Sequence, residues 1–394
     1  MRRLLLVGIL LGGILIILIT LTPGAAITQV MADSPDATRD DYFGLPLCLP
    51  GLPADDTCLL YGPAQVVVEM QASGLPYPPG TLTAAAPPSE LGRLPVRVAK
   101  INHPDNQPVP IFASFEDATA GVNPTRYIEP GRMRYVSYTY HTRDANGKSI
   151  VHLASGEWLR ASPAAYTTFQ GLEFFTNPKN DFGWIIDPTI SSTAPSFGAP
   201  TTGRTYPRDS TIQVYETVQA EGFNWYRISP DEWVSSQKAR VVTLRPTPPE
   251  GVPANRWIEV DLLEQTIMAY EDGRLLFATL MASGLDPHFT QPGVFTIYEK
   301  KALETMQGSF KPGRVDFYYL EDVPWTMYFD QARAFHTAYW HTYFGYPQSN
   351  GCVNLSPGDA HWLFLWANEG DYVWVHDPSG QTPTDPSYYG PGAP

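Results

Sequence analysis

The sequence has little charge and little cysteine. Asp, Glu, Lys and Arg make up 17% of the 394 residues, and only three residues are cysteine. The 40 acidic side chains outnumber the 26 Lys and Arg, which gives a formal net charge of −14. A nucleic acid or an anionic membrane surface is bound through clustered Lys and Arg. We therefore expect no nucleic-acid partner and no binding to an anionic surface.

The sequence also lacks a second long apolar run. Residues 4–21 are almost all apolar and follow Arg2 and Arg3, and Val30 to Ala32 have the small-residue pattern of a signal-peptidase site. The run is also about as long as a membrane-spanning helix requires. We expect residues 1–32 to be either a cleaved signal peptide or a retained N-terminal anchor. In both cases the rest of the chain is expected to lie outside the cytoplasm.

Two of the three cysteines are candidates for a disulfide with each other. Cys48 and Cys58 lie in a Pro/Gly-rich stretch, and in an oxidising compartment a disulfide between them would contribute about 2–3 kcal/mol. Two free buried cysteines are the alternative, and a metal pair is not expected because no further ligands cluster nearby. We expect residues 33–90 to be a disulfide-stapled loop followed by an exposed Pro-rich linker.

Aromatic and turn-forming residues are abundant. The chain has 22 Tyr, 18 Phe, 10 Trp, 32 Gly and 39 Pro, which is typical of a mainly β protein with short strands joined by turns. Residues 91–165 and 185–248 share a pattern of an apolar strand and a later Glu-Trp pair. Both resemble bacterial SH3-like domains, which are small β-barrels. For the tryptophans that carry this resemblance we favour core packing over ligand binding; they are Trp158, Trp225 and Trp233.

A last domain is predicted at residues 255–377, after a Pro-rich linker at residues 245–253. The Asp272-Gly273 pair predicts a hairpin turn, because both residues tolerate positive φ angles. The following segments then alternate in the manner of strands.

One helix is predicted in this domain, at residues 357–368. Ser356 has the side chain of an N-cap, and Pro357 suits the first helical position. Residues 378–394 are rich in Pro, Gly and Ser, and we expect them to be a disordered tail.

The third cysteine, Cys352, needs another explanation. A free thiol is only a few per cent thiolate at neutral pH, so a nucleophilic cysteine needs a base within hydrogen-bond reach. His336 is the candidate base, and Gly351 allows an unusual backbone conformation beside the thiol. Backbone N–H groups of a tight turn at Cys352 would stabilise an oxyanion. The alternative is a small buried cysteine and a structural histidine.

The stretch from His336 to Asn354 resembles the signature of the L,D-transpeptidase (YkuD) family. The family pattern is a His and a small residue, about a dozen residues, then Ser/Thr-His-Gly-Cys, an apolar residue, and Arg or Asn. Here His336-Thr337 is followed by Ser-Asn-Gly-Cys-Val-Asn at residues 349–354. Three upstream segments also resemble family motifs: residues 265–270, Ser283-Gly284 and residues 290–295.

The resemblance implies a β-sandwich with one helix after the cysteine. It makes Cys352 the nucleophile and His336 the base, oriented by the backbone carbonyl of Thr337. The backbone amide of Cys352 would hold the oxyanion, helped by the hydroxyl of Tyr319, with Tyr318 an equal contender.

Four further residues are expected to shape the turn or bind the substrate: Ser349, Asn350, Asn354 and His341. Asn350 departs from the family, which has a second His there, and asparagine cannot carry a proton at neutral pH. His341 is a candidate replacement, and its alternative is an aromatic-packed loop residue. A zinc site is not expected, because the histidines lack the Glu and spacing of a metalloprotease helix.

By resemblance, the activity is acyl transfer on peptidoglycan stem peptides through a thioester, which forms cross-links in the cell wall. Resolution by water would instead make the protein an L,D-carboxypeptidase. A cell-wall-binding or structural protein with an impaired catalytic domain is the alternative from another class. No cofactor is expected, and the protein is expected to be a monomer.

Overall fold

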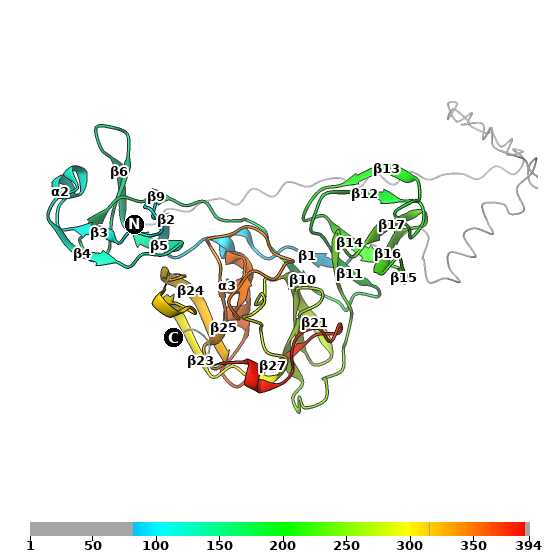
Figure 1. Ribbon diagram of the computed structural model, residues 1–394. Helices are drawn as coiled ribbons and strands as arrows, with labels where there is room; N and C mark the ends of the chain where they lie inside the picture. Colours follow the sequence, from blue (N-terminus) through cyan, green and yellow to red (C-terminus); the bar gives the residue numbers. More distant parts are fainter. Residues whose placement is uncertain (1–81, 315, 391–394) are drawn as a thin grey trace, which may run out of the picture. The chain divides into compact units, whose positions relative to one another are not determined.

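The computed structural model describes residues 82–314 and 316–390 (Figure 1). The targeting segment, the Cys48–Cys58 disulfide and most of the predicted stapled loop and linker lie outside these residues. No helix in the described part of the chain is long and apolar enough to cross a membrane. The described chain is mainly β, as predicted, with several sheets and few helices.

Two large sheets hold the strands of the C-terminal domain together with strands from residues 84–174. The first has the strand order β1-β10-β21-β20-β19-β27-β22. All neighbouring strands are antiparallel except the parallel pair β19-β27. The strands are β1 (Ala84–Ala85), β10 (Leu172–Phe174), β19 (Arg256–Asp261), β20 (Thr266–Glu271), β21 (Arg274–Leu280), β22 (Gly293–Thr296) and β27 (Tyr372–His376).

The second sheet has the order β26-β25-β24-β5-β2-β9, and β23 also pairs with β24. The pairs β25-β26 and β24-β5 are parallel. The strands are β2 (Arg97–Lys100), β5 (Met133–Tyr138), β9 (Ser162–Pro163), β23 (Glu299–Gly308), β24 (Tyr318–Asp330), β25 (Arg333–Thr337) and β26 (Val353–Leu355).

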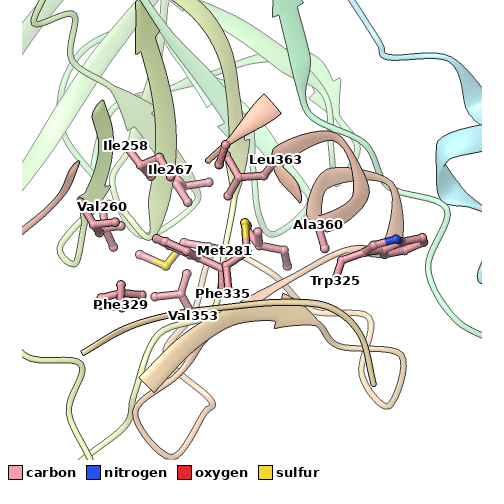
Figure 2. Packing of buried hydrophobic residues seen from close by; sticks show 14 of the residues in the cluster. Ile258, Val260, Ile267, Met281, Trp325, Phe329, Phe335, Val353, Ala360 and Leu363 are labelled. Atoms are coloured by element: carbon pink, nitrogen blue, oxygen red, sulfur yellow. The ribbon is translucent and has the colours of Figure 1, made fainter. Parts of the chain in front are cut away.

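One apolar cluster fills the space between these sheets and helix α3 (Pro357–Trp366). Figure 2 shows Ile258 of β19, Phe335 of β25, Val353 of β26 and Leu363 of α3 packing together, and each is at most 1% exposed. Burial of such side chains contributes about 1.5–3 kcal/mol each. The core therefore fixes the strands on both sides of the cysteine loop.

The start of α3 and the β20-β21 turn match the predictions. The Ser356 side chain accepts the N–H of Asp359 at 3.4 Å, as an N-cap does. Asp272 and Gly273 have φ angles of 52° and 72°, which confirms the predicted turn. The helix ends at Trp366, two residues earlier than predicted, because Ala367 already has an extended conformation.

The first N-terminal module adds a five-stranded sheet with the order β4-β3-β8-β7-β6. A short helix, α2 (Phe115–Ala120), was not predicted. It is capped by the Ser114 side chain, which accepts the N–H of Asp117 at 3.1 Å, and Gly121 ends it with a φ of 73°. The strands are β3 (Val109–Phe112), β4 (Pro124–Ile128), β6 (Tyr140–Arg143), β7 (Ser149–His152) and β8 (Trp158–Leu159).

The second module has a three-stranded sheet, β14-β11-β18, and a five-stranded sheet, β13-β12-β17-β16-β15. It starts at Asp181, four residues before the predicted boundary. The strands are β11 (Asp181–Ile185), β12 (Thr189–Ser192), β13 (Thr201–Tyr206), β14 (Thr211–Val214), β15 (Glu216–Ala220), β16 (Phe223–Ser229), β17 (Glu232–Ser235) and β18 (Ala239–Val242).

The tryptophans of both modules contribute to packing. Trp225 and Trp233 are buried, and half-buried Trp158 contacts Phe115 edge-on at a ring distance of 5.4 Å. Neither module is identified as SH3-like, so that part of the fold stays a prediction.

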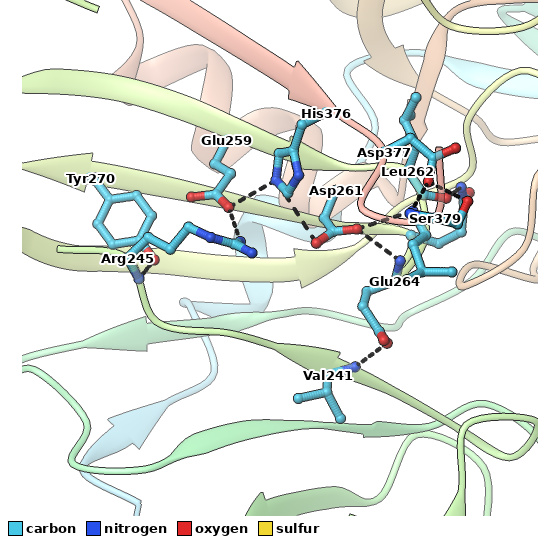
Figure 3. Close-up of polar contacts among 12 residues, drawn as sticks. Val241, Arg245, Glu259, Asp261, Leu262, Glu264, Tyr270, His376, Asp377 and Ser379 are labelled. Atoms are coloured by element: carbon cyan, nitrogen blue, oxygen red, sulfur yellow. Dashed lines mark hydrogen bonds and ion pairs between the residues drawn. The ribbon is translucent and has the colours of Figure 1, made fainter. Parts of the chain in front are cut away.

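Two segments predicted as linkers are held by the fold. Ala84–Ala85 pairs with β10, so the end of the 33–90 segment is a sheet edge. Figure 3 shows the start of the 245–253 linker: the backbone N–H of Arg245 donates to the Tyr270 hydroxyl at 3.2 Å, and its guanidinium donates to Glu259 at 2.6 Å. These polar contacts were not evident from the proline pattern.

The described part of the C-terminal tail also differs from the predicted disorder. Residues 386–388 form a short 3-10 helix, η3 (Pro386–Tyr388), and Tyr389 is only 8% exposed. The Arg333 guanidinium lies 5.2 Å from the Tyr389 ring and donates to the carbonyl of Gly390 at 3.0 Å. A cation–π contact and a hydrogen bond therefore hold the tail against β25.

Candidate active site

The two parallel strands β25 and β26 bring His336 and Cys352 to one place. His336 lies in β25, opposite Asn354 in the ladder, and Cys352 directly precedes β26. Both residues line a pocket of about 710 Å³. Other side chains around the pocket include Glu304, Tyr318, Tyr328, Arg333, His341 and Asn350.

His336 is held by the neighbouring backbone carbonyl of Thr337. Its Nδ1 lies 3.0 Å from the carbonyl oxygen of Thr337, which places the proton on Nδ1 and leaves the Nε2 lone pair free. The side chain is only 3% exposed. Burial lowers its pKa to about 4, because the charged imidazolium loses its hydration. At neutral pH His336 is therefore a neutral base.

Cys352 is half-buried, and its sulfur lies 3.7 Å from the carbonyl oxygen of Ala332. Burial raises the pKa of the thiol to about 11, although the Ala334 N–H and the Arg333 charge act in the opposite direction. Within residues 82–314 and 316–390, no hydrogen bond joins Cys352 to His336. The resting pair is a neutral thiol and a neutral imidazole, not an ion pair.

The turn before Cys352 is held by hydrogen bonds of the Ser349 side chain. Gly351 has a φ of 114°, and a Cβ there would lie 3.3 Å from Nε of Arg333. Ser349 Oγ accepts the Gly351 N–H at 3.1 Å and donates to the Cys352 carbonyl at 2.5 Å. The described residues offer no hydrogen-bond acceptor to the Cys352 N–H, which is free to bind an oxyanion.

The separated upstream motifs converge on this turn. The Ser283 carbonyl accepts the N–H of Ser349 at 2.9 Å. Thr290 Oγ1 accepts the N–H of Gly284 and donates to the Gly351 carbonyl, both at 2.9 Å. Gly284 is required, because a Cβ there would lie 2.1 Å from the carbonyl oxygen of His288. These hydrogen bonds hold the loop before Cys352 in place.

Gln265 completes this support. Its side-chain amide donates to Ser283 Oγ at 2.7 Å and accepts the Ser283 N–H at 2.9 Å. Gln265 is 1% exposed. A buried amide with these bonds fixes the Ser283 backbone, which in turn holds Ser349.

The two tyrosine candidates, Tyr318 and Tyr319, have different surroundings. Successive side chains of a strand point to opposite faces, so only one of the two can face the pocket. Tyr318 lines the pocket with Cys352. The Tyr319 hydroxyl lies 3.5 Å from Glu321, and Tyr319 packs against the core of the first module. Of the two tyrosine candidates, Tyr318 is therefore the one that lines the pocket, and Tyr319 is not.

The three remaining polar predictions all line the pocket. His341 Nε2 lies 3.2 Å from Nδ2 of Asn354, and burial lowers the pKa of His341 to about 4. Asn350 is exposed, and its side chain makes no hydrogen bond to any described residue. His341 is therefore a neutral partner of Asn354, and Asn350 is available to a ligand.

The sequence analysis did not name several residues that line the pocket, among them Glu304, Tyr328 and Arg333. Glu304 and Tyr328 reach the site because β23 and β24 pair side by side. Arg333 lies in β25, close to His336 in sequence, and its charge beside an apolar strand was the available clue. Within the described ranges no group of three or more His, Cys, Asp or Glu is suited to a metal ion.

One family model matches this domain. Residues 255–375 match the model of the YkuD family, described as an L,D-transpeptidase catalytic domain. No curated protein matches the chain.

Solved structures of L,D-transpeptidases are similar to parts of the chain. One from Stackebrandtia nassauensis is 28% identical over 34% of this chain and 59% of that one, with a TM-score of 0.27. The catalytic domain from E. faecium is 28% identical over 32% of this chain and 100% of that one, with a TM-score of 0.28. One from Mycobacterium smegmatis is 19% identical over 52% of this chain and 90% of that one, with a TM-score of 0.30.

The matched span contains both strands of the site, the supporting motifs and helix α3. Residues 255–375 of this chain are a YkuD-family L,D-transpeptidase catalytic domain.

Proposed function

We propose that this domain catalyses acyl transfer on peptidoglycan stem peptides and forms cross-links, with Cys352 as nucleophile and His336 as base. The family acts on peptidoglycan. The observation that carries the proposal is that a thiol and an oriented neutral imidazole, on neighbouring strands, line one pocket. We also propose that the protein works outside the cytoplasm as a monomer.

The neutral state of both groups sets the mechanism. Nε2 of His336 takes the proton of Cys352 while the sulfur attacks the carbonyl at the L–D junction of a donor stem. The pKa values of about 11 and about 4 differ by about seven units, which makes a free ion pair about 10 kcal/mol uphill. A turnover of about one per second allows a barrier of about 17 kcal/mol. Proton transfer during the attack therefore fits within the barrier.

The later steps use the same groups. The Cys352 N–H and the Tyr318 hydroxyl hold the oxyanion, as donors aimed at developing charge do. His336 then returns its proton to the amine of the leaving D-residue, which produces the thioester. An amine from a neighbouring stem resolves the thioester into a cross-link, whereas water would give an L,D-carboxypeptidase.

A wall-binding protein with an impaired domain is the second candidate, and two observations favour it. Asn350 stands at the position of the family's second His and makes no hydrogen bond to any described residue. The sulfur of Cys352 contacts the Ala332 carbonyl, and no described hydrogen bond joins it to His336.

Acylation by a carbapenem separates the two candidates. A related domain from E. faecium has been solved acylated by ertapenem. Intact-protein mass spectrometry is expected to show one adduct on the wild type and none on Cys352→Ala. No adduct on the wild type at any pH between about 6 and 9, where His336 is neutral, would favour the binding role.

The Asn350→His variant tests the departure from the family pattern. We expect turnover of a donor–acceptor peptide pair to rise or stay unchanged, because histidine restores a proton carrier at the pocket. A large loss would show that asparagine has a role of its own at this position.

A further inference from the structure

A carboxylate that the proposed mechanism does not use faces the pocket. Glu304 of β23 lines the pocket together with Cys352 and His336. One of its oxygens accepts the hydroxyl of Tyr328 at 2.7 Å, and the other accepts the ammonium of Lys301 at 2.7 Å. Tyr328 lines the pocket as well. The carboxylate is therefore held in one orientation at the site.

The cation that pairs with this carboxylate does not line the pocket. Lys301 contacts the face of the Tyr328 ring at 5.1 Å and is not among the residues around the pocket. By contrast, the pocket residues Glu129 and Arg314 neutralise each other at 2.7 Å. The two arginines that line the pocket, Arg314 and Arg333, pair with Glu129 and Asp330 and not with Glu304, whose cation is Lys301.

This charge acts on both reacting groups. Burial lowers the pKa of His336, and the Glu304 charge acts in the opposite direction. Burial raises the pKa of Cys352, and the Glu304 charge adds to that rise. The Glu304 charge therefore favours the protonated imidazole and disfavours the thiolate, and these two effects oppose each other when the proton passes from Cys352 to His336.

The acceptor in a cross-linking reaction is a primary amine, which is an ammonium ion at neutral pH because its pKa is about 10.4. Resting on the proposed function, we propose that Glu304, oriented by Tyr328, binds the ammonium group of the acceptor stem beside the thioester. A charge-assisted hydrogen bond to a carboxylate is roughly twice as strong as a neutral one. Water has no charge and gains no such contact, so the subsite favours cross-linking over hydrolysis.

The step is balanced without any further reactant. The bound ammonium releases one proton to solvent, and its nitrogen then attacks the thioester carbonyl. The C–N bond forms, the C–S bond breaks, and the second proton passes from nitrogen through His336 to the leaving sulfur of Cys352. The products are an amide and the free thiol.

The test measures how one thioester partitions. Wild type and Glu304→Gln are loaded with a donor peptide that contains an L–D junction, and a peptide with a free lysine ε-amino group is the acceptor. Chromatography gives the ratio of amide product to hydrolysis product. Glutamine keeps the shape and loses the charge, and we expect the ratio to fall about tenfold. Any effect on acylation cancels in this ratio.

Two variants and one nucleophile serve as controls. Glu299→Gln removes a neighbouring carboxylate that also pairs with Lys301, at 3.4 Å, but does not line the pocket, and its ratio should match the wild type. Tyr328→Phe should lower the ratio in the same direction as Glu304→Gln. With methanol, an uncharged nucleophile, Glu304→Gln and wild type should partition equally.

The outcomes separate this subsite from the proposed function. A thioester that forms on the wild type and partitions identically in Glu304→Gln would overturn the subsite alone. The subsite would also be overturned if Glu304→Gln lowered the ratio of methanol product to hydrolysis product as much as it lowers the ratio of amide to hydrolysis product. The effect would then not depend on the charge of the nucleophile. Absence of any thioester on the wild type would overturn the proposed function and the subsite with it.

Discussion

Replacing one buried carboxylate of helix α3 should change how stability depends on pH. Asp359 is fully buried, and its carboxyl group accepts the N–H of Gly171 at 2.8 Å and the hydroxyl of Thr279 at 2.5 Å. Burial raises its pKa from 3.8 to about 6, although these hydrogen bonds oppose the shift. The folded state therefore binds more protons than the unfolded state between about pH 4 and 6.

The sign and size of the effect follow from this difference. The pKa of Asp359 is higher in the folded state than in the unfolded state. The free energy of unfolding therefore falls as the pH rises from about 4 to about 6, and it is level above that range. A shift of about two units corresponds to about 3 kcal/mol in the free energy of unfolding. Asp359→Asn keeps the shape, can still accept the Gly171 N–H, and has no charge to bury.

Urea unfolding of both proteins at pH 4 and pH 7 measures the effect. The wild type is expected to lose about 2.4 kcal/mol more than Asp359→Asn between these pH values, because the unfolded-state carboxyl is already partly ionised at pH 4. All other titrating groups cancel in the difference. Equal pH dependence of the two proteins would refute the argument that Asp359 is protonated in the folded state near pH 4 and charged at pH 7.

Three further predictions concern the catalytic site. Carbapenem acylation should rise with pH around 4, where His336 becomes neutral, and stay level to pH 8; a rise with an apparent pKa of roughly 8.5, the ordinary thiol value, would contradict the base role. Gly351→Ala should lower the unfolding free energy by about 1–2 kcal/mol, because alanine is strained at positive φ and its Cβ would approach Arg333; an unchanged urea midpoint would argue against this strain. Tyr318→Phe should slow acylation about 100-fold while Tyr319→Phe stays within roughly threefold, and the reverse order in stopped-flow rates would exclude Tyr318 as the oxyanion donor.

Local patterns in the sequence predicted much of this domain. The Asp272-Gly273 turn and the Ser356 cap depend on residues within one turn of each other, and both are present. The motif residues from Ser283 to Thr290 were matched only by resemblance. The structure supplies the reason for their order, since their hydrogen bonds converge on Gly351.

Features that depend on strand facing or on distant pairing were not predictable. A strand turns successive side chains to opposite faces, so choosing between Tyr318 and Tyr319 requires the register, which resemblance left open. Glu304 reaches the pocket only because β23 pairs with β24. The contact between Arg333 and Tyr389 joins the tail to a buried strand, and composition alone indicated disorder there.

The contact between buried Glu259 and half-buried His376 in the first sheet was likewise not predicted. Glu259 accepts Nε2 of His376 at 3.0 Å and the guanidinium of Arg245 at 2.6 Å (Figure 3). The pairing of parallel strands β19 and β27 brings these side chains together. A sequence shows polar residues in alternating strands, but not which strand lies beside which.

The central claim is that the neutral imidazole of His336 removes the proton of Cys352 during attack. The most direct measurement is the rate of carbapenem acylation of His336→Ala relative to wild type at pH 7. We expect the rate to fall at least about 100-fold, the scale of a lost general base. A rate within roughly threefold of the wild type would contradict it, because losing a general base costs far more than that.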